Sequence, residues 1–258
     1  MKASWPYLLN RSSSLSLGLR GWWPGSGGGE SRIRNLGPHL ASSGAFAGTM
    51  PSNGWWAQSI DGGKEAVQLD GTSSRITANP PAFSVPFSFA CWVRFDNLLA
   101  NQALLCVTNN GTSYGRLLVM YYQPFGRLLV DTGAVTNAQC LAAVYANTWH
   151  HVCAVYRSAS ERSIFLDGGN KATDTTYAEM LTPDLVEFGS YLNSTHLAGR
   201  MAEIGIWNRA LSDSEVYRLW HPSTRWDLRR TVDNSVWVSG GGATEEASQQ
   251  VLTLLGVG

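Results

Sequence analysis

Hydrophobic and polar residues alternate along much of this chain with a period of two, which is typical of β-strands that bury one face. The clearest strand is expected over 87–95, with one apolar face made of Phe87, Phe89, Cys91, Val93 and Phe95. Shorter segments of similar character lie at 66–71, 103–108, 116–122, 127–131, 149–157 and 163–167. Between such segments lie Asn110-Gly111 and Asp167-Gly168, and these residue types tolerate the positive φ of tight hairpin turns. The pattern predicts many short antiparallel strands.

One short helix is expected after these strands. Ser212 is a natural N-cap, and Glu215, three residues later, completes a capping box. Leu211 and Val216 fit a hydrophobic staple, and the apolar stripe is formed by Val216, Leu219 and Trp220. Residues 197–220 therefore predict a core strand that runs directly into a capped helix.

Strands at close spacing with a single late helix indicate an all-β protein and not alternating βαβ units. We predict a two-sheet antiparallel β-sandwich, or jelly roll, with one short helix on the C-terminal side and extended terminal arms. The expected organisation is an N-terminal arm over 1–20, a sandwich over 21–226 and a C-terminal tail or assembly segment over 227–258.

The charge of the chain argues against two classes of partner. It has 19 basic and 19 acidic residues, and only 15% of its residues are charged. Without a basic block there is no electrostatic footprint for nucleic acid. No apolar run approaches the roughly 20 residues of a membrane helix, so no membrane partner is expected. The N-terminus is too polar for a signal peptide, so we expect assembly in a cytoplasm.

Six motifs occur in an order that resembles the laminin-G-like and pentraxin-like jelly rolls of the concanavalin A-like lectin and glucanase group. They are GLRGWWP (18–24), AVQLDGTSSRIT (66–77), FSFACWVRF (87–95), NTWHHVCAVY (147–156), SIFLDGG (163–169) and GRMAEIGIWNRALSDSEV (199–216). The resemblance covers about 21–226 and implies two curved antiparallel sheets packed face to face.

The resemblance also implies a disulfide between Cys91 and Cys153, which occupy the positions whose pentraxin counterparts are bridged. The residues themselves allow another outcome. The four cysteines have no CxxC or metal-knuckle spacing, and they can all be buried thiols. In a reducing compartment Cys91 and Cys153 would be thiols too, and the sequence leaves both outcomes open.

The chemistry of the relatives does not transfer to this chain. Pentraxins bind calcium through acidic residues in the loop before the Gly-Arg-Met strand, but 188–194 holds no carboxylate. Jelly-roll glycosidases carry a Glu-x-Asp-x-x-Glu motif, and here Glu203 is followed by Gly205 and Asn208. A single carboxylate cannot serve as both acid and nucleophile. We therefore expect no catalytic residues, no metal site and no cofactor, with calcium disfavoured.

A lectin-like site would use exposed aromatic rings that stack on sugars. The candidates are three pairs: Trp22 and Trp23, Trp55 and Trp56, and Tyr121 and Tyr122. The alternative is structural, because one member of each pair would face the core of an alternating strand. His150 and His151 are also neighbours, so they are expected on opposite faces, one packed and one exposed.

The GWWP opening and the WHPSTRWDL exit at 220–228 resemble single-domain proteins of tailed bacteriophages. We therefore predict a non-enzymatic virion surface protein, either a capsid decoration or a tail-associated subunit. Its partners would be other virion subunits or copies of itself, with a cell-surface glycan as a further candidate. The alternative is a secreted, extracellular lectin-like module that binds carbohydrate.

Overall fold

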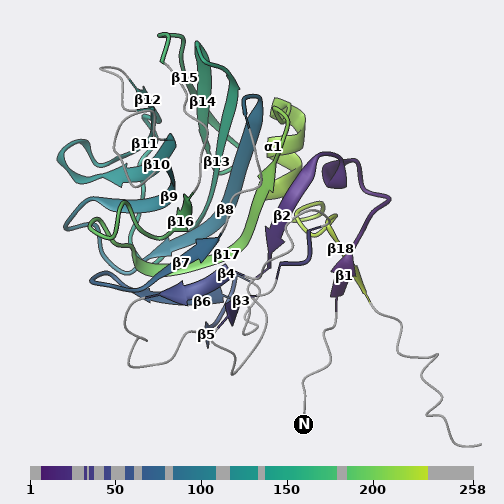
Figure 1. Cartoon of the computed structure of the whole chain (residues 1–258), viewed down its shortest axis with the longest axis horizontal. Helices are drawn as coiled ribbons and strands as arrows, with labels where there is room; N and C mark the ends of the chain where they lie inside the picture. The colour runs from purple at the N-terminus through teal and green to yellow at the C-terminus, as the bar shows by residue number, and fades with distance from the viewer. Residues whose placement is uncertain are drawn as a thin grey trace, which may run out of the picture.

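Two antiparallel sheets lie face to face in the computed structural model, which describes residues 7–24, 32–33, 35–37, 44–47, 56–60, 66–78, 84–108, 117–132, 137–178 and 185–231. The described strands, the single described α-helix, α1 (Asp213–Trp220), and the antiparallel pairing confirm the predicted all-β sandwich. Figure 1 shows a third layer on the right, where α1 and the terminal strands cover one of the two sheets.

We call the sheet farther from α1 the front sheet. In spatial order it contains β12 (Ala138–Gln139), β11 (Arg127–Asp131), β10 (Leu117–Tyr122), β9 (Gln102–Thr108), β16 (Leu185–Phe188), β7 (Arg75–Ala78), β4 (Gly44–Ala47) and β3 (Arg32–Ile33). The 3-10 turn η2 (Gln123–Phe125) joins β10 to β11.

The back sheet lies between the front sheet and α1. Its order is β15 (Gly169–Asp174), β14 (Glu161–Leu166), β13 (Trp149–Ser158), β8 (Phe87–Phe95), β17 (Ala198–Trp207), β6 (Ala66–Asp70) and β5 (Trp56–Ala57), and β2 (Leu19–Trp23) pairs with the second half of β17. The turn between β14 and β15 holds Asp167 and Gly168 with φ of 52° and 71°, as the sequence predicts for this hairpin.

The main core lies between the two sheets. It contains the predicted face of β8, which is Phe87, Phe89, Cys91, Val93 and Phe95, together with inward residues of the front sheet such as Val119 and Phe188. These side chains are at most 1% exposed. Burial of one large apolar side chain adds roughly 1.5–3 kcal/mol to the free energy of unfolding.

The outer face of the back sheet is covered by helix α1 (Asp213–Trp220). Ser212 caps this helix, and both bonds of the predicted capping box with Glu215 are present. Val216 and Leu219 pack in one buried cluster with Ala90, Trp207 and Phe165 of the back sheet. We call this cluster the outer cluster. The predicted helix is confirmed. None of the described helices is long and apolar enough to cross a membrane.

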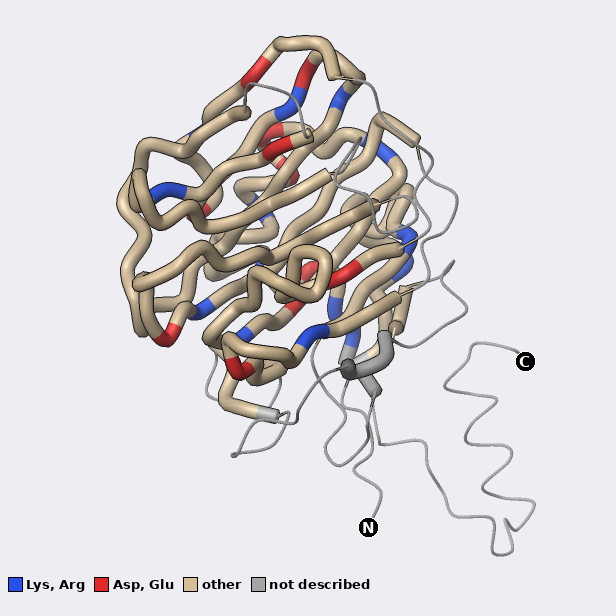
Figure 2. The backbone as a smooth tube through the Cα atoms, turned by 60° about the vertical axis from the view of Figure 1, so that its left-hand side comes forward, with Lys and Arg blue, Asp and Glu red and all other residues tan. Residues whose placement is uncertain are grey.

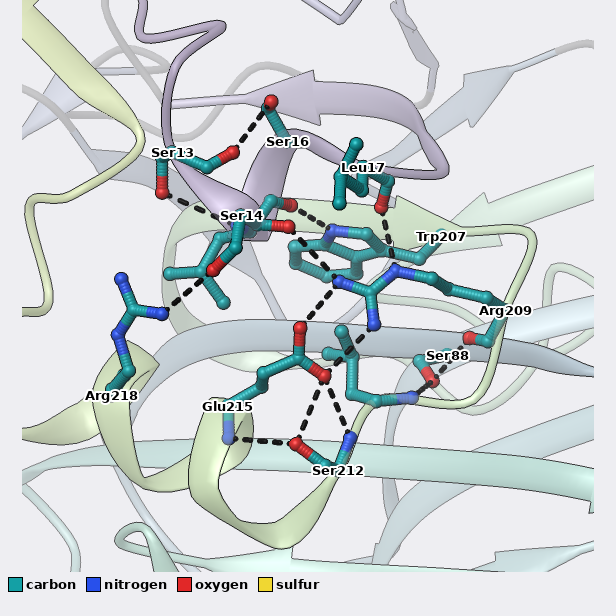
Figure 3. A network of polar contacts seen from close by, with 12 residues as sticks. Ser13, Ser14, Ser16, Leu17, Ser88, Trp207, Arg209, Ser212, Glu215 and Arg218 are labelled. Atoms are coloured by element: carbon teal, nitrogen blue, oxygen red, sulfur yellow. Dashed lines mark hydrogen bonds and ion pairs between the residues drawn. The ribbon is translucent and has the colours of Figure 1, made fainter.

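An N-terminal segment is fixed on the same face (Figure 3). The 3-10 turn η1 (Ser14–Ser16) buries Leu15 completely in the outer cluster. The indole Nε1 of Trp207 donates to the Leu15 carbonyl at 2.7 Å, and Arg209 Nε donates to the Leu17 carbonyl at 2.7 Å. The guanidinium of Arg209 is itself held by two bonds to the Glu215 carboxylate, at 2.7 and 2.8 Å.

The described ends of the chain pair with each other. Strand β1 (Tyr7–Leu9) is antiparallel to β18 (Arg229–Thr231), and Asn10 N donates to the Leu228 carbonyl at 2.8 Å. Leu15, Leu19 and Leu228 are buried in one cluster with α1. The packing is therefore continuous across residues 20 and 227, where the sequence suggests domain boundaries.

Of the two outcomes that the sequence leaves open for Cys91 and Cys153, the structure has the buried thiols and not the disulfide that the resemblance implies. The register of β13 on β8 places Cys91 opposite Val152 and Cys153 opposite Ala90. Neighbouring positions on a strand point to opposite faces, so Cys91 enters the main core and Cys153 enters the outer cluster. All four cysteines are buried free thiols.

The packing of the N-terminal segment can be tested with two leucines. We expect Leu15→Ala to lower the free energy of unfolding by about 2–5 kcal/mol, because it opens a cavity beside α1. Leu17→Ala is the matched control: Leu17 is 64% exposed, so a change within about 0.5 kcal/mol is expected. Urea unfolding followed by tryptophan fluorescence measures both. Equal stability of the two variants would show that this segment does not belong to the core.

Candidate functional site

A groove of about 500 Å³ lies on the outer face of the front sheet. Side chains alternate along β10, so Val119 and Tyr121 enter the main core while Leu118, Met120 and Tyr122 face the groove. Side chains on the outer face of the front sheet therefore line a groove, whereas those on the outer face of the back sheet pack against α1.

The floor of the groove is apolar. Leu118, Met120 and Leu129 form a buried cluster there, and Tyr122 and Tyr191 pack against it. Phe125 of η2 is 58% exposed and lies edge-on to Tyr122, with 5.3 Å between the ring centroids. The groove thus combines a buried apolar base with three aromatic rings that remain partly or largely accessible.

Polar side chains line the remaining sides of the groove. Gln139 Nε2 donates to Asn137 Oδ1 at 2.7 Å, and Asn101 Oδ1 accepts the backbone N–H of Gln123 at 3.0 Å. Asp131 and Thr195 also line it. Apolar pockets with a few fixed polar groups are typical of sites for small molecules and sugars.

The loop after β16 closes one side of the groove and is held by its own backbone. Tyr191 N donates to the Thr195 carbonyl at 3.1 Å, and the Tyr191 carbonyl accepts the backbone N–H and the hydroxyl of Ser194 at 3.0 and 2.7 Å. These bonds hold Tyr191 and Thr195 at the groove without a ligand.

Among the described members of the three aromatic pairs predicted to stack on sugar, Tyr122 alone lines this groove. Tyr121 faces the main core, 5.6 Å from the ring of Phe95. Trp22 and Trp23 are 0% and 1% exposed, because α1 and the N-terminal segment cover the outer face of the back sheet as well. Sugar stacking by Trp22, Trp23 and Tyr121 is therefore wrong. Trp55 and the side chain of Trp56 lie outside the described residues.

Sequence reasoning missed Phe125, Tyr191 and the amides of the groove. Phe125 follows Pro124 in a turn between two predicted strands, where an exposed aromatic side chain is a signal of binding. Nothing in the sequence places Tyr191 and Tyr122 at one groove, because their common position depends on how β16 and β10 assemble in the front sheet.

Glu203, which stands at the first position of the incomplete glycosidase motif, lies on the back sheet, and its carboxylate is bound there. Its carboxylate accepts Trp22 Nε1 at 3.0 Å and binds Arg229 Nη2 at 2.5 Å. Gly205 stands where the motif has an acid, and a Cβ at that position would lie 2.5 Å from the Trp207 ring. A larger residue does not fit beneath this indole. Glu203 therefore holds β2 and β18 against β17.

A family model described as the concanavalin A-like lectin/glucanases superfamily matches residues 70–217, more than half of the chain. The protein belongs to this superfamily. Its two sheets form a lectin-like β-sandwich, a fold of the carbohydrate-binding type. A search among curated proteins finds no match.

Several solved structures share this superfamily fold. Domain 4 of AbnA, an extracellular arabinanase of Geobacillus stearothermophilus solved in complex with arabinotriose, has a TM-score of 0.62 and 16% identity, covering 79% of this chain and 98% of that chain. Trypanosoma rangeli sialidase has a TM-score of 0.60 and 16% identity, covering 82% of this chain and 33% of its own. The binding domain of botulinum neurotoxin DC, solved in complex with rat synaptotagmin II, has a TM-score of 0.57 and 10% identity, covering 80% and 52%. At these identities the likeness shows the fold alone.

Acidic residues of the described chain serve local structure. The carboxylate of Asp70 accepts backbone N–H groups of Thr72, Ser73 and Ser74 at 2.8–2.9 Å. Within the described ranges there is no group of three or more His, Cys, Asp or Glu side chains that could hold a metal ion. Basic and acidic residues are interspersed over the described part of the sandwich (Figure 2).

The two neighbouring histidines point to opposite faces, as expected, but both are buried. His150 Nδ1 lies 2.9 Å from the Asp167 carboxylate, and its Nε2 accepts the backbone N–H of Tyr145 at 3.0 Å. His151 is 2% exposed on the outer face, where its ring centroid is 5.4 Å from that of Trp92. The prediction that one of the two histidines is exposed is wrong, because the layer that covers the outer face of the back sheet also buries His151.

Burial lowers the pKa of His151 from 6.5 to about 4, against the opposing effect of Asp167. Between these two values the unfolded chain binds a proton that the folded protein does not, so stability falls as the pH decreases through this window. At 1.4 kcal/mol for each pKa unit, the loss is roughly 3 kcal/mol between pH 7 and pH 4.

We expect His151→Phe to flatten this acid limb, since phenylalanine removes the titration and keeps a ring beside Trp92. Urea unfolding at pH 7, 6, 5 and 4 measures the effect. His221→Gln changes a partly exposed histidine and should leave the limb as steep as in the natural protein. An unchanged slope in His151→Phe would assign the acid sensitivity to other groups.

Proposed function

We propose that the protein is a non-enzymatic carbohydrate-binding protein whose ligand lies in the groove of the front sheet. The observation that carries this proposal is the combination of Tyr122, Phe125 and Tyr191 over an apolar floor with amide groups at the rim. Aromatic rings can cover the apolar face of a sugar, while amides and hydroxyls exchange hydrogen bonds with its hydroxyl groups. When the aromatic and amide groups are already held in place before binding, less conformational entropy is lost as the sugar binds.

The spacing of carboxylates supports binding without catalysis. Asp131 on β11 and Glu187 on β16 lie in one row of the front sheet, through Leu118 and Cys106 on the two strands between them. Three strand spacings separate them by roughly 14 Å. Retaining and inverting glycosidases need about 5 and about 6.5–9.5 Å between their two carboxyl groups.

We expect Tyr122→Ala and Phe125→Ala each to weaken sugar binding about tenfold, which corresponds to about 1.4 kcal/mol. A glycan array identifies ligands, and arabinotriose is the first soluble probe for calorimetry because the similar arabinanase domain binds it. Tyr145→Ala is the matched control, since Tyr145 is an exposed tyrosine that does not line the groove.

Two results would contradict the groove as the site. One is the absence of saturable binding to every sugar on the array. The other is sugar binding that survives both groove variants with its affinity unchanged.

Display on a virion is a further part of our proposal. Strands β1 and β18 pair on the side of α1 (Figure 1), whereas the groove lies on the outer face of the front sheet. The chain therefore enters and leaves the described fold at one place, away from the groove. That arrangement suits a subunit, on capsid or tail, that is attached through its ends and presents the groove outward. An extracellular lectin-like module is the alternative.

Size-exclusion chromatography with light scattering tests the attachment. We expect the full chain to associate and a 7–231 truncation to be monomeric, because the truncation keeps β1, β18 and the buried Leu15 but lacks the flanking segments. A truncation to 21–226 would be a poor choice, since it removes part of the outer cluster. Monomers in both cases would contradict self-assembly through the ends.

A further inference from the structure

A second feature of the molecule lies on the outer face of the back sheet, beyond the end of α1. The guanidinium of Arg225 is placed between two indole rings, with its Cζ 5.7 Å from the centroid of Trp92 and 5.0 Å from that of Trp226. Its backbone is fixed too, because Arg225 N donates to the His221 carbonyl at 2.8 Å. The position of this cation is set by the fold.

Arg225 has no carboxylate partner among the described residues, although acids lie nearby. Glu203 is bound by Arg229 and by the indole of Trp22, and Asp227 is bound by Arg218 at 2.6 Å. Arg225 makes no side-chain hydrogen bond within the described chain, and its Nε is buried without an acceptor. Glu203 and Asp227 are thus paired with Arg229 and Arg218, and no described carboxylate neutralises the charge of Arg225.

A small buried cavity supports the same conclusion. It is lined by Arg225, His151 and Glu203 together with Trp92, and its volume of about 10 Å³ is enough for one water-sized atom. His151 is 98% buried in its wall, and its Nδ1 has no hydrogen-bond partner among the described residues. Buried polar atoms without partners are uncommon in folded proteins, and here two of them belong to side chains of one cavity.

The surroundings of Arg225 are aromatic. Trp149 and Trp220 pack partly buried against Trp92, and Tyr217, which is half-exposed, lies 5.5 Å from the ring of Trp220. An arginine fork recognises carboxylate and sulfate groups through paired hydrogen bonds, and the rings beside it can cover the apolar face of a sugar.

We propose that Arg225 is the centre of a second binding site, separate from the groove, for a sugar that carries an anionic group such as a carboxylate or a sulfate. The anion binds the guanidinium, and the sugar ring lies against the neighbouring indoles. A free inorganic anion shares the charge chemistry but not the ring contact, so the two ligand sources can be distinguished.

The full-length protein is titrated with glucuronate, glucose, sulfate and chloride at constant ionic strength. Binding is followed by the Nε–H resonance of Arg225 in ¹H–¹⁵N spectra and by tryptophan fluorescence. We expect saturable shifts with glucuronate, weaker shifts with sulfate, and none with glucose or chloride. Arg225→Gln should lower the affinity for glucuronate at least tenfold, and Arg225→Lys should lower it less.

Arg230→Gln is the matched control, because Arg230 is an exposed arginine of β18, and it should bind glucuronate as the natural protein does. Tyr122→Ala should also leave this binding unchanged, which separates the site from the groove. Near-UV circular dichroism verifies that the Arg225 variants keep their tryptophan packing.

Three outcomes would overturn the proposal. Equal responses to chloride and glucuronate would mean nonspecific screening. A response to sulfate but not to glucuronate would mean an adventitious ion only. Glucuronate binding that persists unchanged in both Arg225→Gln and Arg225→Lys would place the anion elsewhere.

Discussion

The central strands β8 and β13 of the back sheet are buried on both faces along most of their length, and most of the molecule's other features follow from this constraint. Antiparallel sheets commonly leave one face in water. Here the front sheet covers the inner face, and α1, η1 and the segment that leads to β18 cover the outer one. Strand β8 is accordingly buried along nearly its whole length. Two adjacent tryptophans, two adjacent histidines and the two cysteines at 91 and 153 are all buried for the same reason, although the members of each pair point in opposite directions.

The outer layer is attached through irregularities in β17. At Glu203, which has a φ of 50°, β17 changes its neighbour from β6 to β2, and its register on β8 shifts between Ala202 and Gly205. A left-handed conformation in a residue with a side chain costs about 1–3 kcal/mol. The hydrogen bond of Glu203 to Trp22 and its ion pair with Arg229 offset this cost. They also connect β2, which contains Trp22, and β18, which contains Arg229, to β17. Glu203, the only acid of the Glu-x-Asp-x-x-Glu pattern that this strand contains, therefore has a structural role.

The front sheet differs because its outer face carries a groove instead of a covering layer. Leu118, Met120 and Leu129 make the outer face of the front sheet apolar. Residues of η2 and of the loop after β16 line the groove above these side chains. Binding in such a fold depends on what stands beside the sheet and not on the sheet itself. The aromatic and amide groups of the groove come from β9 to β12 and from the loop before β17, so the site exists only once both halves of the front sheet have assembled.

The sequence by itself determined several central strands of both sheets, the apolar face of 87–95 and where α1 begins. These features are local: the period of two identifies the shared face of Phe87 to Phe95, and the capping box at Ser212 and Glu215 needs only four residues. Only the tertiary structure decided what covers each face and how neighbouring strands are aligned. Periodicity groups Trp22 and Trp23 on opposite faces but cannot tell that both faces are covered. The sequence also cannot fix the register that sets Cys153 opposite Ala90, since a shift of one residue reverses every side chain of a strand. The sequence names Tyr122 as a candidate for sugar binding, whereas the roles proposed for Phe125, Tyr191 and Arg225 rest on the segments that the fold brings beside them.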